Sequence, residues 1–151
     1  MASLYPSDVA ALVVFDIWIG NWDRGGNIKA AVVSEHLPLF LAFDHSHALL
    51  NVDETAGGSI ARLGGGSLIV ESHPFYGRAT PDMLDKWVER IARMDAGTVA
   101  ECCGFGRPFR SVGTETQEAL GIALAARAGD LPRIVSENKA KIQVQGHHGN
   151  R

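Results

Sequence analysis

The most informative stretch of this 151-residue chain is FDIWIGNWDRGGN, residues 15–27, where an apolar segment gives way to polar residues and glycines. Upstream of this change, apolar residues and one aspartate recur at helical spacing, at Val9, Leu12, Val13, Asp16 and Ile19. Ser7 is suited to cap such a helix and Gly20 to end it, so we predict a largely buried helix over residues 8–19. The polar residues that follow would then start at a helix end that is held in the core.

Two short apolar runs come next, at residues 28–33 and 39–43. The segment between them, 34–38, is polar apart from a leucine and a proline, so the runs predict two paired strands joined by a turn. Asp44 follows the second run directly. A hairpin of this kind brings Asp44 back beside the polar residues at the end of the helix.

The rest of the chain divides into a glycine-rich part and a helical part. Residues 51–80 hold six glycines, which favours a long mobile loop that serves a site. Beyond this loop we expect four helices, at 81–94 with Thr80 as cap, at 96–103, at 114–127 opened by a capping box of Thr114 and Gln117, and at 130–138.

Composition narrows the class of protein. The chain is 46% hydrophobic and 21% charged, enough to bury one core rather than remain disordered. Its net charge of -3, without a long run of either sign, gives no indication of a nucleic-acid partner or an anionic membrane surface. The apolar run 9–19 is shorter than the roughly 18 residues of a membrane span, and the adjacent Cys102 and Cys103 suggest a reducing compartment. We therefore expect a cytoplasmic protein without a membrane span.

The polar residues at the two element ends are suited to phosphoryl transfer. That reaction needs a carboxylate to orient and deprotonate the attacking hydroxyl, and a metal ion to offset charge on the phosphate. Carboxylate and amide oxygens are ligands that suit Mg²⁺. We assign Asp23 as the base and Asn27 and Asp44 as metal ligands, with Asn21 and Arg24 fixing either the loop or the phosphate.

The same residues carry a family resemblance. The run GNWDR at 20–24, then Asn27, then FDHS at 43–46, resembles the catalytic and metal-binding loops of HipA-like kinases. The related phosphatidylinositol 3/4-kinase-like group shares the Asp-Arg pair and the downstream aspartate. The resemblance implies ATP and Mg²⁺ as cofactors and transfer to a hydroxyl, often on a protein. It also places His45 on the cofactor side, where the histidine would brace the metal-binding loop.

Two features depart from the family pattern. Three residues separate Asp23 from Asn27, where the family usually has four. Only 22 residues precede Asp23, which leaves no room for the strand-rich lobe that grips ATP. The expected fold is therefore α+β: a mainly helical, protein-kinase-like C-terminal lobe over residues 1–142 with a small antiparallel β-hairpin, without the N-terminal lobe. Residues 143–151 are expected to form a disordered tail.

Several alternatives stay open at this stage. The chain could be a catalytically inactive, kinase-derived protein-interaction domain, or one subunit of a split kinase that a separate N-terminal lobe completes. A small metal-dependent hydrolase using Asp23, Asp44 and nearby histidines is a third candidate. Asp16 could simply hydrogen-bond the loop that follows it. The segment 105–110 mixes aromatic and basic residues and is interpreted as an interhelix loop whose two arginines could contact a partner.

Overall fold

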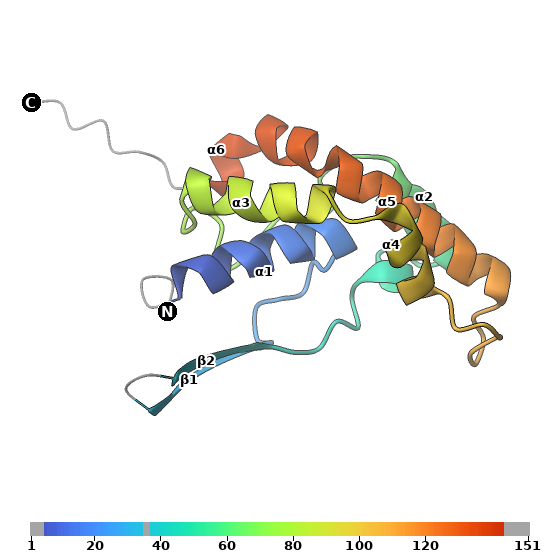
Figure 1. Cartoon of the computed structure of the whole chain (residues 1–151), viewed down its shortest axis with the longest axis horizontal. Helices are drawn as coiled ribbons and strands as arrows, with labels where there is room; N and C mark the ends of the chain where they lie inside the picture. Colours follow the sequence, from blue (N-terminus) through green and yellow to red (C-terminus); the bar gives the residue numbers. More distant parts are fainter. Residues whose placement is uncertain (1–4, 35–36, 144–151) are drawn as a thin grey trace, which may run out of the picture.

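Helices make up most of the structure, a computed structural model that describes residues 5–34 and 37–143. In chain order, as labelled in Figure 1, the elements are α1 (Pro6–Ile19), β1 (Ile28–Ser34), β2 (Leu37–Ala42), the 3₁₀-helix η1 (Leu49–Asn51), α2 (Ala56–Gly64), α3 (Pro81–Ala92), α4 (Ala96–Cys103), α5 (Thr114–Glu137) and α6 (Lys139–Ile142). The expected α+β class, mainly helical with a small antiparallel hairpin, is confirmed.

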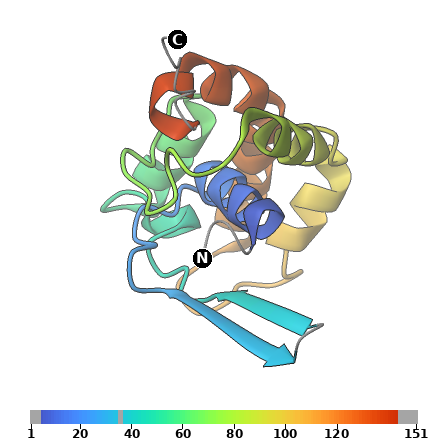
Figure 2. The same ribbon diagram turned by 90° about the vertical axis from the view of Figure 1, so that its left-hand side faces the viewer.

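Helix α1 is the centre of the core. Viewed nearly along its axis in Figure 2, it has other helices above it and on both sides, and only the face of Asp8, Ala11 and Phe15 is not buried. A helix with so wide an apolar surface is stable only inside such a core. It begins earlier than predicted, with Tyr5 rather than Ser7 at the N-cap, because Pro6 is well suited to the first helical position.

The end of α1 is where the sequence predicted it. Gly20 adopts a φ of 73° and donates its backbone N–H to the carbonyl of Asp16, a left-handed helix cap. A Cβ atom at this position would lie 2.7 Å from the Val52 side chain. Glycine therefore both turns the chain out of the helix and lets the segment around Val52 approach it.

The hairpin projects from one side of the helical body (Figure 1). Its antiparallel register pairs Ile28 with Ala42 at the base and Ser34 with Leu37 at the tip. The predicted hairpin is confirmed, but the turn is shorter than the expected 34–38, since only residues 35–36 separate the strands and these lie outside the described part of the chain. Pro38 is tolerated within β2 because a two-stranded sheet consists of edges.

The prediction of one long loop over residues 51–80 is wrong for its first part, which contains α2. Thr55 caps this helix, its side chain accepting the backbone N–H of Gly58 at 3.0 Å. Leu63 is fully buried, and α2 packs against α5. Glycines lower helix propensity, but burial of one face against a neighbouring helix outweighs that cost.

The two helices predicted at 114–127 and 130–138 are a single helix, α5. Gly113 rather than Thr114 is at the N-cap, so the expected capping box does not form. The helix continues through Pro132, although proline gives up a backbone hydrogen bond inside a helix. One apolar stripe holds it together on both sides of that proline, at Leu120, Leu124, Ala128, Leu131 and Val135.

The C-terminal end of the described chain is part of the fold. Gln143 forms an isolated parallel bridge with Ala79, so the tail expected at 143–151 begins no earlier than residue 144. The rest of that predicted tail, 144–151, lies outside the described residues. Within residues 5–34 and 37–143, no helix is both long and apolar enough to span a membrane.

Candidate functional site

A buried ion pair at the end of α1 is the scaffold of the site. Both carboxylate oxygens of Asp16 accept from Arg24, at 2.7 Å from Nε and 2.7 Å from Nη2. The Asp16 side chain is 0% exposed and the Arg24 side chain is 1% exposed. A bidentate ion pair of this kind is among the strongest polar contacts in proteins. It binds the last turn of α1 to the loop that leaves it.

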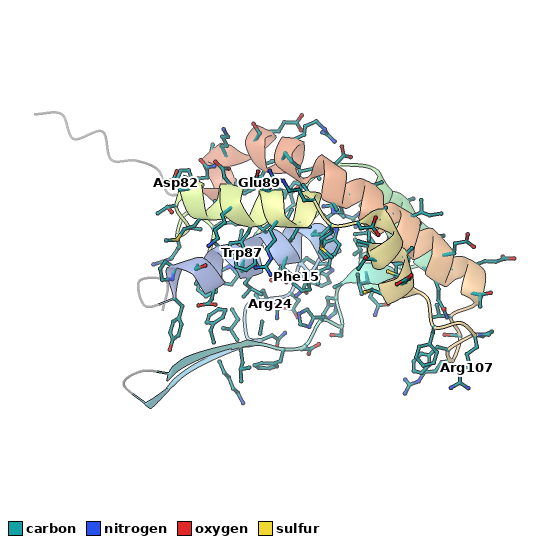
Figure 3. All side chains as sticks on the ribbon, viewed as in Figure 1. Phe15, Arg24, Asp82, Trp87, Glu89 and Arg107 are labelled. Atoms are coloured by element: carbon teal, nitrogen blue, oxygen red, sulfur yellow. The ribbon has the colours of Figure 1, made fainter. Side chains whose placement is uncertain are left out.

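Arg24 also reaches the hairpin. Its Nη1 donates to the backbone carbonyl of Phe43 at 2.7 Å and to that of Asn27 at 3.2 Å. Figure 3 shows Arg24 between α1 and the strands. Of the two roles left open by the sequence, these contacts support fixing the loop, because all three nitrogens of the guanidinium donate to protein oxygens. Asp16 likewise has the loop-binding role considered for it.

His73 and Asn21 complete the environment of Asp16. His73 Nε2 lies 3.0 Å from the Asp16 carboxylate, and its Nδ1 accepts the backbone N–H of Phe75 at 3.2 Å. Because Nδ1 accepts, Nε2 carries the hydrogen and donates to Asp16. Asn21 Nδ2 donates to the same carboxylate at 3.2 Å, while Asn21 Oδ1 is buried without a hydrogen-bond partner among the described residues.

The contacts of Asp16 with Arg24 and His73 make the free energy of unfolding depend on pH. Burial alone would raise the pKa of the Asp16 carboxyl, but hydrogen bonds from Arg24 and His73 and the Arg24 charge lower this pKa below its ordinary value of 3.8. A lowered pKa in the folded state stabilises the fold above the unfolded pKa, and this contribution is lost as pH falls through the folded value.

We therefore expect the free energy of unfolding to decrease as pH falls below about 4. Urea denaturation at a series of pH values from neutral to acidic measures this decrease. The Asp16→Asn variant, less stable at neutral pH, should show a smaller decrease. An equal decrease in both proteins would place the acid sensitivity at other carboxyl groups.

The other predicted residues meet at the base of the hairpin. Asn27 Nδ2 donates to the backbone carbonyl of Asp23 at 3.1 Å. The backbone N–H of Phe43 donates to the carbonyl of Asn27 at 3.1 Å, which extends the strand pairing one step past Ile28 and Ala42. Asn27 therefore lies opposite Phe43, the residue that precedes Asp44. The hairpin brings Asp44 to the polar loop, as the sequence predicted.

Asp44 is an exposed, ionised carboxylate in a turn of its own. Its φ of 52° is left-handed, a conformation that aspartate tolerates better than most residues. Hydrogen bonds from Ser46 lower the pKa of the Asp44 carboxyl, and the charges of His47 and His45 add to the effect. The Ser46 backbone N–H donates to Oδ1 at 3.0 Å, which fixes the carboxylate within the turn.

Two histidines line the approach to these carboxylates. The His45 ring lies edge-on to Phe15 of α1, with 5.9 Å between centroids, which braces the Asp44 turn against the helix. His47 lies 3.7 Å from the Asp23 carboxylate, and its ring is tilted by 53° against the Trp22 ring with 4.5 Å between centroids. These contacts agree with the bracing role expected of His45.

The donor atoms that the sequence predicts for a metal ion are oxygens, a ligand type that suits Mg²⁺. The described residues contain no ready cluster of three or more His, Cys, Asp or Glu side chains that could hold a metal ion. Mg²⁺ commonly takes one or two carboxylates and completes its shell with water and phosphate oxygens. The oxygens available here are the carboxylates of Asp23 and Asp44 and Oδ1 of Asn27. The amide nitrogen of Asn27 already donates to the backbone carbonyl of Asp23.

Asp23 also faces open space. Its side chain is 48% exposed and lines a cleft of about 410 Å³ together with Trp22, Gly25, Ser72 and Pro74. An acceptor hydroxyl could therefore approach the carboxylate from solvent. Arg24, the next residue, is turned inward into the scaffold.

All six predicted residues thus lie around the end of α1 and the base of the hairpin, in two groups. Asn21 and Arg24 are buried against Asp16, whereas the solvent-accessible group is Asp23, Asn27, Asp44 and His45. His73 was not assigned to the site from the sequence, because nothing local connects it to a partner 57 residues away. Comparison with models of protein families, with curated proteins and with solved structures finds no match.

Proposed function

We propose that this chain is the C-terminal, catalytic-loop lobe of an ATP-dependent phosphotransferase of the HipA-like kind. One observation supports the proposal above others: the hairpin register and the Arg24 contacts hold Asn27 and Asp44 beside the loop that carries Asp23. Phosphoryl transfer depends mainly on positioning and charge compensation, so a fixed set of oxygen donors is the feature that it requires.

Each residue has a distinct role in this proposal. Asp23, exposed beside its cleft, orients the acceptor hydroxyl and takes its proton. Asn27 and Asp44 hold Mg²⁺, which when bound offsets negative charge on the phosphate oxygens. Arg24 keeps the loop in place through Asp16. Asn21 contributes one further hydrogen bond to that carboxylate.

The acceptor is proposed to be a serine or threonine hydroxyl on a protein. The open cleft beside Asp23 is compatible with an extended polypeptide, since its lining is exposed at Trp22, Gly25 and Pro74. A reducing, cytoplasmic location suits the two cysteines, Cys102 and Cys103, which are both free thiols.

Calorimetric titration of ATP into the purified chain, with and without Mg²⁺, tests the proposal. We expect binding that requires Mg²⁺ and has a dissociation constant no weaker than about 1 mM. In Asp44→Asn the magnesium-dependent heat should be lost. Asn tolerates the left-handed backbone at this position, so the variant should retain the turn.

Glu118→Gln is the matched control, because it removes one exposed carboxylate from α5. This variant should bind as the native chain does. Equal binding by Asp44→Asn and the control would contradict the metal role of Asp44. No binding by the native chain would contradict a nucleotide-binding role for the chain alone, and would favour an interaction domain or a subunit that a separate N-terminal lobe completes.

A further inference from the structure

The loop between α4 and α5, residues 104–113, displays two aromatic rings to solvent. Phe105 is 55% exposed and Phe109 is 51% exposed. The rings touch edge to face, with 5.2 Å between their centroids. Neighbouring exposed aromatic rings of this kind are typical of the anchors that dominate protein interfaces.

Each ring is covered by an arginine. Arg107 lies over Phe105 at 5.5 Å from the ring centroid, and Arg110 lies over Phe109 at 5.6 Å. Neither arginine forms an ion pair within the described part of the chain. A guanidinium that stacks on a ring keeps its edge free for bidentate pairing with a carboxylate.

The local charge of this loop is opposite to that of the chain. The sequence has no Asp or Glu between Glu101 and Glu115, whereas the chain as a whole carries -3. By contrast, four other arginines have carboxylate partners, at Arg24, Arg62, Arg93 and Arg133. The loop is thus a small positive patch that complements an acidic ligand.

The loop is held in shape by buried polar contacts. The Gln117 side chain, 5% exposed, accepts the backbone N–H of Phe105 at 2.8 Å and donates to the carbonyls of Arg107 at 3.0 Å and Val112 at 3.3 Å. Phe109 and Val112 exchange two backbone hydrogen bonds. A loop that is already fixed loses little conformational entropy on binding.

An apolar pocket of about 240 Å³ opens beside the two rings. Its walls include Phe105, Phe109, Leu50, Cys103 and Leu120. This volume accommodates an aliphatic or aromatic side chain. The patch therefore combines one apolar recess with two cationic groups at its edge.

We propose that this loop binds an acidic segment of a partner protein. Two carboxylates of the segment pair with Arg107 and Arg110, and one apolar side chain enters the pocket beside Phe109. A nucleic acid is less suited to the patch, because it needs positive charge along a longer track and this chain is acidic overall. The proposal is independent of the phosphotransferase site: Figure 3 places Arg107 at the end of the molecule away from the hairpin.

The probe is a random copolymer of glutamate and tyrosine, titrated into the full chain by calorimetry, with polyglutamate as the probe that lacks an apolar anchor. The native chain should bind the copolymer more tightly than polyglutamate. Two double variants, Arg107→Glu with Arg110→Glu and Phe105→Ser with Phe109→Ser, should each bind the copolymer at least about tenfold more weakly. All four side chains are exposed, so far-UV circular dichroism should remain native.

The matched control is the double variant Arg78→Glu with Arg93→Glu, which reverses the charge of two exposed arginines elsewhere on the chain. It changes the net charge by the same amount as the Arg107 and Arg110 variant does. It should retain the binding of the native chain. Equal loss in this control and in the Arg107 and Arg110 variant would overturn the proposal, as would no binding by the native chain. Tighter binding of single-stranded oligodeoxythymidylate than of the copolymer, lost in the same variants, would replace the protein partner with a nucleic acid.

Discussion

Replacing Arg24 with alanine is expected to lower the free energy of unfolding by about 3–5 kcal/mol, because it leaves the Asp16 carboxylate buried without its charged partner. Asp16 is 0% exposed, so water cannot replace the lost guanidinium without opening the core. The carbonyls of Phe43 and Asn27 lose the same donor. Urea denaturation followed by tryptophan fluorescence measures the loss.

Arg93→Ala is the control for this prediction. Arg93 also pairs with a carboxylate, that of Glu89, but it is 76% exposed. An exposed pair contributes at most about 1 kcal/mol, so the control should be close to the native chain in stability. If Arg24→Ala were no less stable than Arg93→Ala, the buried pair would not be the link that holds α1, its loop and the hairpin together.

Replacing Arg127 with methionine is expected to cost about 2–4 kcal/mol, because it leaves buried backbone carbonyls without donors. Arg127 is fully buried on α5. Its Nε and Nη2 donate to the carbonyl of Ile17 at 3.1 and 3.0 Å, and its Nη1 donates to that of Leu63 at 3.2 Å. Methionine fills a similar space but donates no hydrogen bond.

The position of those carbonyls explains how a cation can be buried there. Ile17 is in the last turn of α1 and Leu63 is in the last turn of α2, where carbonyls lack partners within their helix and carry partial negative charge. Burial lowers the pKa of Arg127 to about 10, which still leaves it charged at neutral pH. No carboxylate among the described residues lies within ion-pair distance of it.

Arg78→Met provides the comparison, since Arg78 is exposed. Substitutions at such positions usually change stability by no more than about 0.5 kcal/mol. Equal stability of Arg127→Met and Arg78→Met in urea denaturation would show that the carbonyls of Ile17 and Leu63 find other donors. Both variants remove one arginine, so net charge does not separate them.

Local signals were sufficient where an element ends in a residue with a special backbone preference or repeats a clear period. Gly20 was predicted to end α1, and its left-handed φ does so. The range of α4, 96–103, was predicted to the residue. The hairpin was found from two apolar runs, although its strands extend further into the predicted turn.

Local signals misled where packing outweighs propensity. Glycine content predicts a loop where α2 forms, and the pattern around Asp130 predicts a new helix in the middle of α5. Leu63 of α2 and the apolar stripe of α5 are buried against other helices, and that burial is a property of the assembled core. The spacing of Thr114 and Gln117 predicts a capping box, whereas the Gln117 side chain holds the 104–113 loop.

By itself, the sequence determined that the chain is mainly helical and of the α+β class. It also determined which polar residues follow the first helix and the hairpin, because hydrophobic periodicity and glycine placement are signals that act over a few residues. Only the tertiary structure decided that Asp23 faces solvent while the adjacent Arg24 is buried. It alone brought His73 to Asp16 and Arg127 to two helix ends. These outcomes depend on buried charges finding partners from distant segments, a requirement that no local pattern records.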